Sequence, residues 1–239
     1  MQHRAAFAAH THVSHFCLFM PATERRKVVL VGDTNCGKAS LLSVFVKGRF
    51  PEVSNGMAFE DCQASLDVGT EEVQLTLWNT SGHENYQHLR SISYVDADVF
   101  VICFSIDEHS SLESATEKWA KEVRKNSLQV PLILVGMKSD LRDNMEGKPV
   151  PVLVSEAEGK NAASSIGAFA YIECSARLCQ QVREVFELAV LAANSRQRGQ
   201  RSIHPRSKIG KTITEMKSTS QHGGESSVGG AKFNSNGAV

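Results

Sequence analysis

A glycine-bearing loop between an apolar run and an amphipathic segment constrains this chain most. The apolar run, Lys27–Gly32, is of the kind that is buried on both faces of a parallel sheet. The loop Gly32–Lys38 follows, and Ala39–Lys47 then carries apolar residues at helical spacing. Glycines let backbone N–H groups wrap a phosphate chain, the lysine supplies a cation, and the helix N-terminus adds its dipole. The segment therefore predicts a phosphate-binding loop, and a chance glycine turn is the weaker alternative.

The rest of the chain alternates strand and helix patterns. Phe59–Val68 and Val73–Trp78 alternate in period two with Gly69-Thr70 between them, which predicts a hairpin. Further strands are expected at Val99–Ser105, Leu132–Val135 and Phe169–Cys174, and helices at Leu112–Val123, Glu156–Ile166 and from Val182 to about Asn194. This order predicts an α/β fold: a doubly wound, mostly parallel six-stranded sheet with one antiparallel edge strand.

Composition sets limits on organisation and partners. The 239 residues suit one domain at 26–194, a flexible N-terminal extension at 1–25 and a disordered tail at 195–239. The formal net charge of zero gives no field that would favour nucleic acid. Six cysteines without a metal-ligand spacing favour a reducing, intracellular and cytoplasmic setting. No apolar run reaches the length of a membrane span. Between Arg196 and Lys217, seven Lys or Arg residues against one Glu allow weak peripheral contact with anionic lipid, and a solvated tail is the alternative.

Several segments, taken in order along the chain, resemble one family. They are Gly32–Lys38, Phe50–Val53, Leu77–Gly82, Leu89-Arg90, Cys103–Asp107, Leu134–Gly136 with Lys138 and Asp140, and Glu173–Ala176. Together they resemble the Rho family of small GTP-binding proteins, which are P-loop NTPases of the Ras superfamily. The resemblance covers residues 26–194, and Trp78 ahead of the Asn79–Gly82 segment favours Rho over other Ras-like families.

The resemblance implies a site for GTP or GDP. The residues that would hold the phosphates are Gly32, Asp33, Thr34, Asn35, Cys36, Gly37, Lys38, Ala39 and Ser40, with Lys38 on the outer two. Phe50 would pack on the guanine edge, Asp140 would accept from its N1–H and amine, and Lys138 would lie along the base. Ser175 and Ala176 would place a backbone N–H on the guanine oxygen.

The resemblance also implies partner surfaces, with outputs in actin organisation and cell shape. Phe59 and Glu60 would belong to an effector face, together with Trp78. Exchange factors and effectors would bind the second switch at Tyr86, Leu89 and Ile92. For Phe50, Leu89 and Ile92 a plain core role remains an alternative.

Three departures from the family pattern fall on magnesium ligands. Ala39 stands where the loop normally supplies a hydroxyl, and Met57 stands where the first switch offers a threonine. Asn79 replaces the aspartate that supports the metal through water. Because Mg²⁺ prefers hard oxygen ligands in near-octahedral geometry, neither alanine nor methionine can substitute. We expect weakened nucleotide binding and leave the metal open.

Other departures fall on hydrolysis and on base recognition. His83 occupies the position of the glutamine that orients the attacking water, and Thr34 puts a side chain where the family has a glycine. Met137 fills the asparagine position before Lys138, and Ser81 resembles the Rnd branch, whose members bind GTP without appreciable hydrolysis. We expect slow or absent hydrolysis in a regulatory binding module. An active GTP phosphohydrolase, a nucleotide-free scaffold and a decayed duplicate with little function remain alternatives.

Two further segments differ from Rho proteins. The stretch from Asp140 to Glu156 is shorter than the Rho insert, and Pro149 and Pro151 disfavour a helix there. The sequence carries no cysteine after Cys179, from which we expect no prenyl anchor.

Overall fold

The computed structural model describes residues 24–52, 59–142 and 152–203. In sequence order the elements are β1 (Glu24–Gly32), α1 (Lys38–Lys47), β2 (Phe59–Val68), β3 (Glu71–Thr80), η1 (Glu84–Tyr86), α2 (Gln87–Ser93), β4 (Val99–Ser105), α3 (His109–Ser114), η2 (Ala115–Trp119), α4 (Ala120–Asn126), β5 (Leu132–Met137), η3 (Ser139–Leu141), α5 (Glu156–Ser165), β6 (Tyr171–Cys174) and α6 (Val182–Ile203). The six strands form one sheet in the order β2-β3-β1-β4-β5-β6. All neighbours pair in parallel except β2 and β3, so the predicted sheet with its antiparallel edge strand is confirmed.

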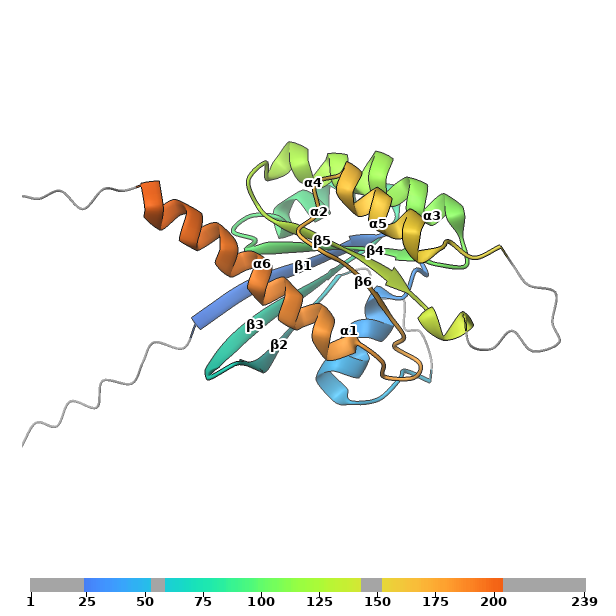
Figure 1. The fold of residues 1–239 in the computed structure, drawn as a ribbon, viewed down its shortest axis with the longest axis horizontal. Coiled ribbons are helices and arrows are strands. Elements are labelled where there is room, and N and C mark those ends of the chain that lie inside the picture. The colour runs from blue at the N-terminus through green and yellow to red at the C-terminus, as the bar shows by residue number, and fades with distance from the viewer. Residues whose placement is uncertain (1–23, 53–58, 143–151, 204–239) are drawn as a thin grey trace, which may run out of the picture. The chain divides into compact units, whose positions relative to one another are not determined.

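Both faces of the sheet are covered, which explains the apolar run that opens the domain. In β1, Val28 and Leu30 belong to a core shared with α1 and α6, whereas Val29 and Val31 belong to a second core with the helices of the opposite layer. Figure 1 shows α6 and α1 on one side of the strands and α2 to α5 on the other. A strand that alternates between two cores can place an apolar residue at every position.

The predicted hairpin is present. β2 and β3 pair from Phe59↔Thr80 to Val68↔Glu71, which leaves Gly69-Thr70 as the connection. Gly69 has φ +66°, a left-handed conformation that glycine adopts without steric cost. The same register brings Glu60 opposite Asn79 near the carboxyl ends of the parallel strands. The hairpin therefore carries the Asn79–His83 segment to the edge of the sheet where the phosphate loop lies.

The two ends of the domain differ from the sequence prediction. β1 begins at Glu24, because its backbone pairs with β3 from Glu24↔Val73 although its first side chains are charged. Residues 24 and 25 are therefore strand, not part of a flexible extension. At the other end, α6 continues past Asn194 to Ile203. Once its buried face has nucleated the helix, residues with high helix propensity such as Arg and Gln allow the backbone helix to continue beyond the apolar periodicity.

The hydrophobic pattern does not predict the short helix α2, because this helix buries polar side chains and exposes apolar ones. It buries Arg90 and Ser93, while Leu89 is 48% and Ile92 62% exposed. The helical segment expected at Leu112–Val123 is longer than predicted, running from His109 to Asn126 through a π-helical turn at η2.

Some predictions concern residues outside the described ranges. They are the flexible extension at residues 1–23, the role of Met57, the short insert around Pro149 and Pro151, the disordered tail at 204–239 and most of the basic stretch Arg196–Lys217. Within the residues that the structure does describe, none of the helices has the length and apolar character to cross a bilayer.

Candidate functional site: a phosphate loop beside an altered metal corner

The phosphate loop connects β1 to α1 and leaves the start of the helix open. Gly37 is the residue before α1 and has φ +111°, and it provides no side-chain cap. No acidic residue lies in the first turn. The first N–H groups of a helix lack partners within the helix, and they carry the positive end of its dipole. The end of α1 can therefore receive an anion.

Lys38 lies beneath this loop with a fixed ammonium group. Its Nζ donates to the carbonyl oxygens of Gly32 and Asp33, at 2.8 Å each. The residue is only 6% exposed. The two carbonyls hold the cation at the loop without neutralising it, since no carboxylate is among these partners. The predicted role of Lys38 as the phosphate-facing cation is thus compatible with its position.

Trp119 ties the loop to the helical layer. Its indole Nε1 donates to Asp33 Oδ1 at 2.8 Å, and its ring is completely buried. The guanidinium of Arg90 and the ammonium of Lys118 each lie 4.8 Å from the centre of this ring. The indole therefore fixes the second residue of the loop from below.

The Asn79–His83 segment packs directly against the phosphate loop. A Cβ added at Gly82 would lie 2.4 Å from the backbone nitrogen of Thr34 and 2.6 Å from the carbonyl oxygen of Gly32. Only glycine permits this approach. Thr80 reinforces it, because its hydroxyl donates to the carbonyl of Leu30 at 2.7 Å. Gly82 therefore packs directly on the backbone of the phosphate loop at Thr34.

Asn79 and His83 sit in contrasting surroundings within this segment. Asn79 is 5% exposed, and among the described residues its Oδ1 has no hydrogen-bond partner. His83 is exposed; its Nδ1 accepts from the backbone N–H of Asn85 at 3.3 Å. One nitrogen of the imidazole is therefore used to cap η1.

The side chains at the metal corner do not fit a magnesium ion. Ala39, at the second position of α1, offers a methyl group, and Asn79 offers one neutral amide oxygen. Across residues 24–52, 59–142 and 152–203, no group of three or more His, Cys, Asp or Glu side chains is placed to hold a metal. Because Mg²⁺ takes hard and mostly anionic oxygen ligands, the described residues supply no anionic ligand here.

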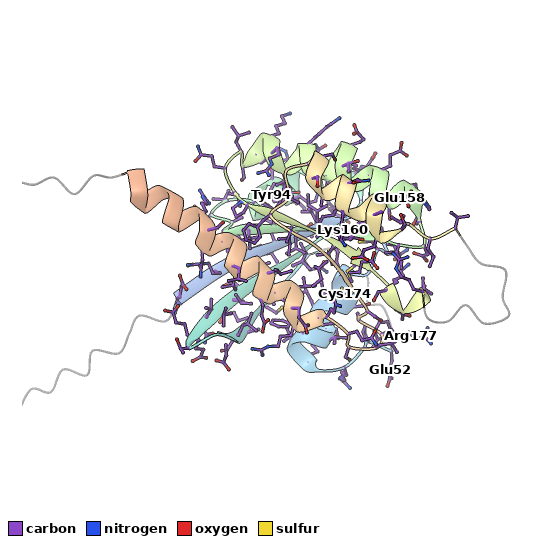
Figure 2. All side chains as sticks on the ribbon, in the orientation of Figure 1. Glu52, Tyr94, Glu158, Lys160, Cys174 and Arg177 are labelled. Carbon is purple, nitrogen blue, oxygen red and sulfur yellow. The ribbon has the colours of Figure 1, made fainter. Side chains whose placement is uncertain are left out.

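The base side of the site is held by a buried carboxylate. Asp140 is 5% exposed, and its Oδ1 accepts from the hydroxyl of Ser175 at 2.7 Å. Ser175 and Gln180 exchange backbone hydrogen bonds of 3.0 and 2.9 Å, and Ala176 is buried beside them. Figure 2 labels Cys174 at the end of β6 and Arg177 on the loop that follows, which locates this corner.

Lys138 adopts φ +66° and pairs with Asp107, its Nζ lying 3.3 Å from both carboxylate oxygens. Burial alone would raise the pKa of Asp107, but the Ser105 hydroxyl and the Lys138 ammonium outweigh it and hold that pKa below its usual value. The structure therefore places Lys138 on the surface side and Asp140 on the buried side of the same corner.

Phe50, predicted on the guanine edge, is 46% exposed.

Met137 lies under the phosphate loop rather than toward solvent. It is 1% exposed, its Cε would lie 3.2 Å from a Cβ at Gly37, and its Sδ lies 3.5 Å from Cys174 Sγ. At this position the chain joins the base side to the phosphate side by apolar packing.

The predicted partner surface lies on η1 and α2. Tyr86 is 39%, Leu89 48% and Ile92 62% exposed, so the core alternative is wrong for Leu89 and Ile92. Phe59 and Glu60 open β2, where only their backbone is described, and Met57 lies outside the described residues.

Sequence reasoning missed a buried ion pair that supports this surface from behind. Arg90 is 1% exposed and donates to Glu122 at 2.8 and 2.9 Å, and to the carbonyls of Ser81 and His83 at 3.0 and 2.7 Å. The hydroxyl of Tyr94, labelled in Figure 2, donates to Glu122 at 2.6 Å. Burial disfavours the charged carboxylate, yet these donors hold the pKa of Glu122 below its usual value. A lone arginine inside a weakly patterned segment carries no sequence signal for burial.

Comparison with known proteins places this geometry in a family. A family profile described as Ras family matches residues 27–195, which is most of the chain. Over 180 residues the chain is 48% identical to the GTP-binding protein RHO1 of Candida albicans, an alignment that covers 72% of this chain and 90% of that protein. With the fold, the phosphate loop and these matches in agreement, the chain belongs to the Rho group of the Ras family of small GTPases.

Proposed function

We propose that this protein is a Rho-like signalling module that binds guanine nucleotide weakly and hydrolyses GTP slowly or not at all. The observation that carries the proposal is the contrast within one site. Lys38 is held at the phosphate loop by two carbonyl contacts, and Asp140 is held by Ser175. The neighbouring positions assigned to the metal, in contrast, have Ala39 and an Asn79 oxygen without a hydrogen-bond partner among the described residues. The residues that would recognise the nucleotide, Lys38 and Asp140, are present, whereas residues that would bind the metal ion in relatives are replaced, at Ala39 and Asn79.

Slow hydrolysis is supported by the setting of His83. In Ras-like proteins, partner-assisted hydrolysis accelerates the reaction by about 10⁵ and depends on a residue that orients the attacking water. His83 replaces that glutamine, and its Nδ1 accepts from Asn85 within its own turn. A histidine base is chemically possible near neutral pH. It would nevertheless act without the anionic metal ligands that assist phosphoryl transfer in the family.

The proposed partners are effector proteins and exchange factors. The exposed side chains of Tyr86, Leu89 and Ile92 offer an apolar surface, and Arg90 fixes the backbone behind it. By resemblance to Rho proteins, we propose outputs in actin organisation and cell shape, inside the cell. The basic stretch Arg196–Lys217 would add weak peripheral contact with anionic lipid, at about 1 kcal/mol for each well-placed charge.

The test is the nucleotide content and turnover of the purified chain. We expect denatured protein to release GTP or GDP, or the folded protein to take up a fluorescent guanine nucleotide at high concentration. Lys38→Ala should weaken uptake by about ten- to a hundredfold, the usual worth of a charge-assisted hydrogen bond. Lys47→Ala is the matched control, because this exposed lysine lies at the far end of the same helix.

Two results would replace the proposal with its alternatives. Absence of any guanine nucleotide, with no uptake by a chain that still unfolds cooperatively, would leave a nucleotide-free scaffold. Phosphate release from GTP that is well above buffer and lost in Lys38→Ala would identify an active GTP phosphohydrolase instead.

A further inference from the structure

The two positions that would flank a magnesium ion in relatives, Ala39 and Asn79, carry no charged side chain. At the positions that the family resemblance assigns to the metal, the chain has the methyl of Ala39, in the first turn of α1, and the amide of Asn79, near the end of β3. The Asn79 side chain is buried, with only 5% of its surface exposed, and its Oδ1 has no hydrogen-bond partner in the described part of the chain. An amide oxygen accepts hydrogen bonds and offers no direct contact to a phosphate oxygen, but because it is neutral it repels phosphate less than a carboxylate would.

We infer that this protein retains guanine nucleotide independently of magnesium, an inference that rests on the proposed function. A carboxylate at the position of Asn79 would both bind a metal and repel the phosphates, so it would make the metal necessary. The amide removes both effects together.

Two positive groups, the N-terminus of α1 and the Lys38 ammonium, can receive phosphate without a divalent ion. The first turn of α1 has no acidic residue, and the Nζ of Lys38 is held at the loop by two carbonyl oxygens. The nearest acidic residue of the loop, Asp33, already accepts from the buried Trp119 at 2.8 Å. The described groups at this corner therefore leave the anion facing the helix dipole and one ammonium group.

The experiment measures the affinity of a fluorescent GDP for the purified full chain in magnesium buffer and in excess EDTA. We expect the two dissociation constants to agree within about threefold, less than the tenfold change that corresponds to 1.4 kcal/mol. The double variant Ala39→Thr/Asn79→Asp restores a hydroxyl and a carboxylate. It should lose affinity by more than about tenfold in EDTA and recover it with magnesium.

Asn85→Asp is the matched control, because it adds the same charge on an exposed turn of the neighbouring segment. It should remain insensitive to EDTA. Binding by the unaltered chain that falls more than about tenfold in EDTA would overturn this inference and leave the proposed function standing. Absence of binding in both buffers would overturn both.

Discussion

The phosphate loop and the Asn79–His83 segment touch, yet they are stabilised in different ways. In the loop, polar groups are paired: Lys38 contacts two carbonyls and Asp33 receives the Trp119 indole. In the neighbouring segment, the Asn79 oxygen has no hydrogen-bond partner within the described part of the chain, and His83 is exposed. The segment keeps its place through its backbone, because Gly82 packs on the loop and Arg90 binds two of its carbonyls. The loop is therefore held in place by paired side chains, whereas the neighbouring segment is held in place by contacts to its backbone.

Removing the buried ion pair behind the segment should have the largest effect on stability. Glu122→Ala leaves Arg90 charged and buried against Trp119, and loss of one partner of a buried pair costs about 3–5 kcal/mol. Urea unfolding followed by circular dichroism measures the change. Glu117→Ala removes the exposed Lys121 pair on the same helical run and should change stability by less than about 0.5 kcal/mol.

The acid dependence of stability sharpens the same comparison. Since the pKa of Glu122 is lowered in the folded state, its contribution is present above its unfolded pKa of about 4.3. That contribution is lost as the pH falls through the lower folded pKa. Between about pH 5 and about pH 3, Glu122→Gln should therefore lose less stability than the unaltered chain. Equal losses for the two proteins would show that this carboxylate does not hold the segment.

Gly82→Ala tests whether the two regions depend on direct backbone contact. The added methyl meets the backbone of Thr34, Asp33 and Gly32, none of which can move as a side chain would. We expect a loss of about 1–3 kcal/mol and separation of the segment from the loop. Thermal unfolding and hydrogen exchange at the loop amides provide the measurement, with the exposed His88→Ala as control. Unchanged exchange in Gly82→Ala would contradict the contact.

The sequence predicts the sheet far better than it predicts this second region. Period-two and continuous apolar runs reflect burial on the faces of strands, so β1 to β6 and the hairpin follow from the pattern. The phosphate loop follows too, because its glycines and lysine are tied to one backbone shape. Arg90 does not, since a single buried arginine becomes recognisable only when Glu122, distant in sequence, is folded beside it. The extension of α6 past Asn194 does not follow from the pattern, because the apolar periodicity ends there while the backbone helix continues to Ile203.

A single hydrogen bond connects the loop to the helical layer, and Trp119→Phe removes it while keeping a buried ring. The Asp33 carboxylate then loses its donor at 2.8 Å, and we expect a loss of about 1.5 kcal/mol, the lower end for a charged partner. A double-mutant cycle with Asp33→Asn isolates the pair from the altered packing of the ring. Additive effects of the two substitutions would mean that the indole contributes only its volume.

The smallest expected effect concerns the backbone on the base side, where the two halves of the site again differ. In the phosphate loop, left-handed positions are occupied by Gly37 and by Asn35, which tolerates them. After β6, Cys179 and Gln181 each adopt φ +55°. Left-handed backbone costs a non-glycine residue about 1–2 kcal/mol in the folded state. A glycine avoids this cost but loses more conformational entropy on folding, which offsets about 0.5–1 kcal/mol of the gain. Gln181→Gly should therefore stabilise the protein by about 0.5 kcal/mol in urea unfolding. Gln180→Gly, whose backbone is not left-handed, should shift the midpoint in the opposite direction, and a loss of stability in both variants would show that Gln181 carries no strain.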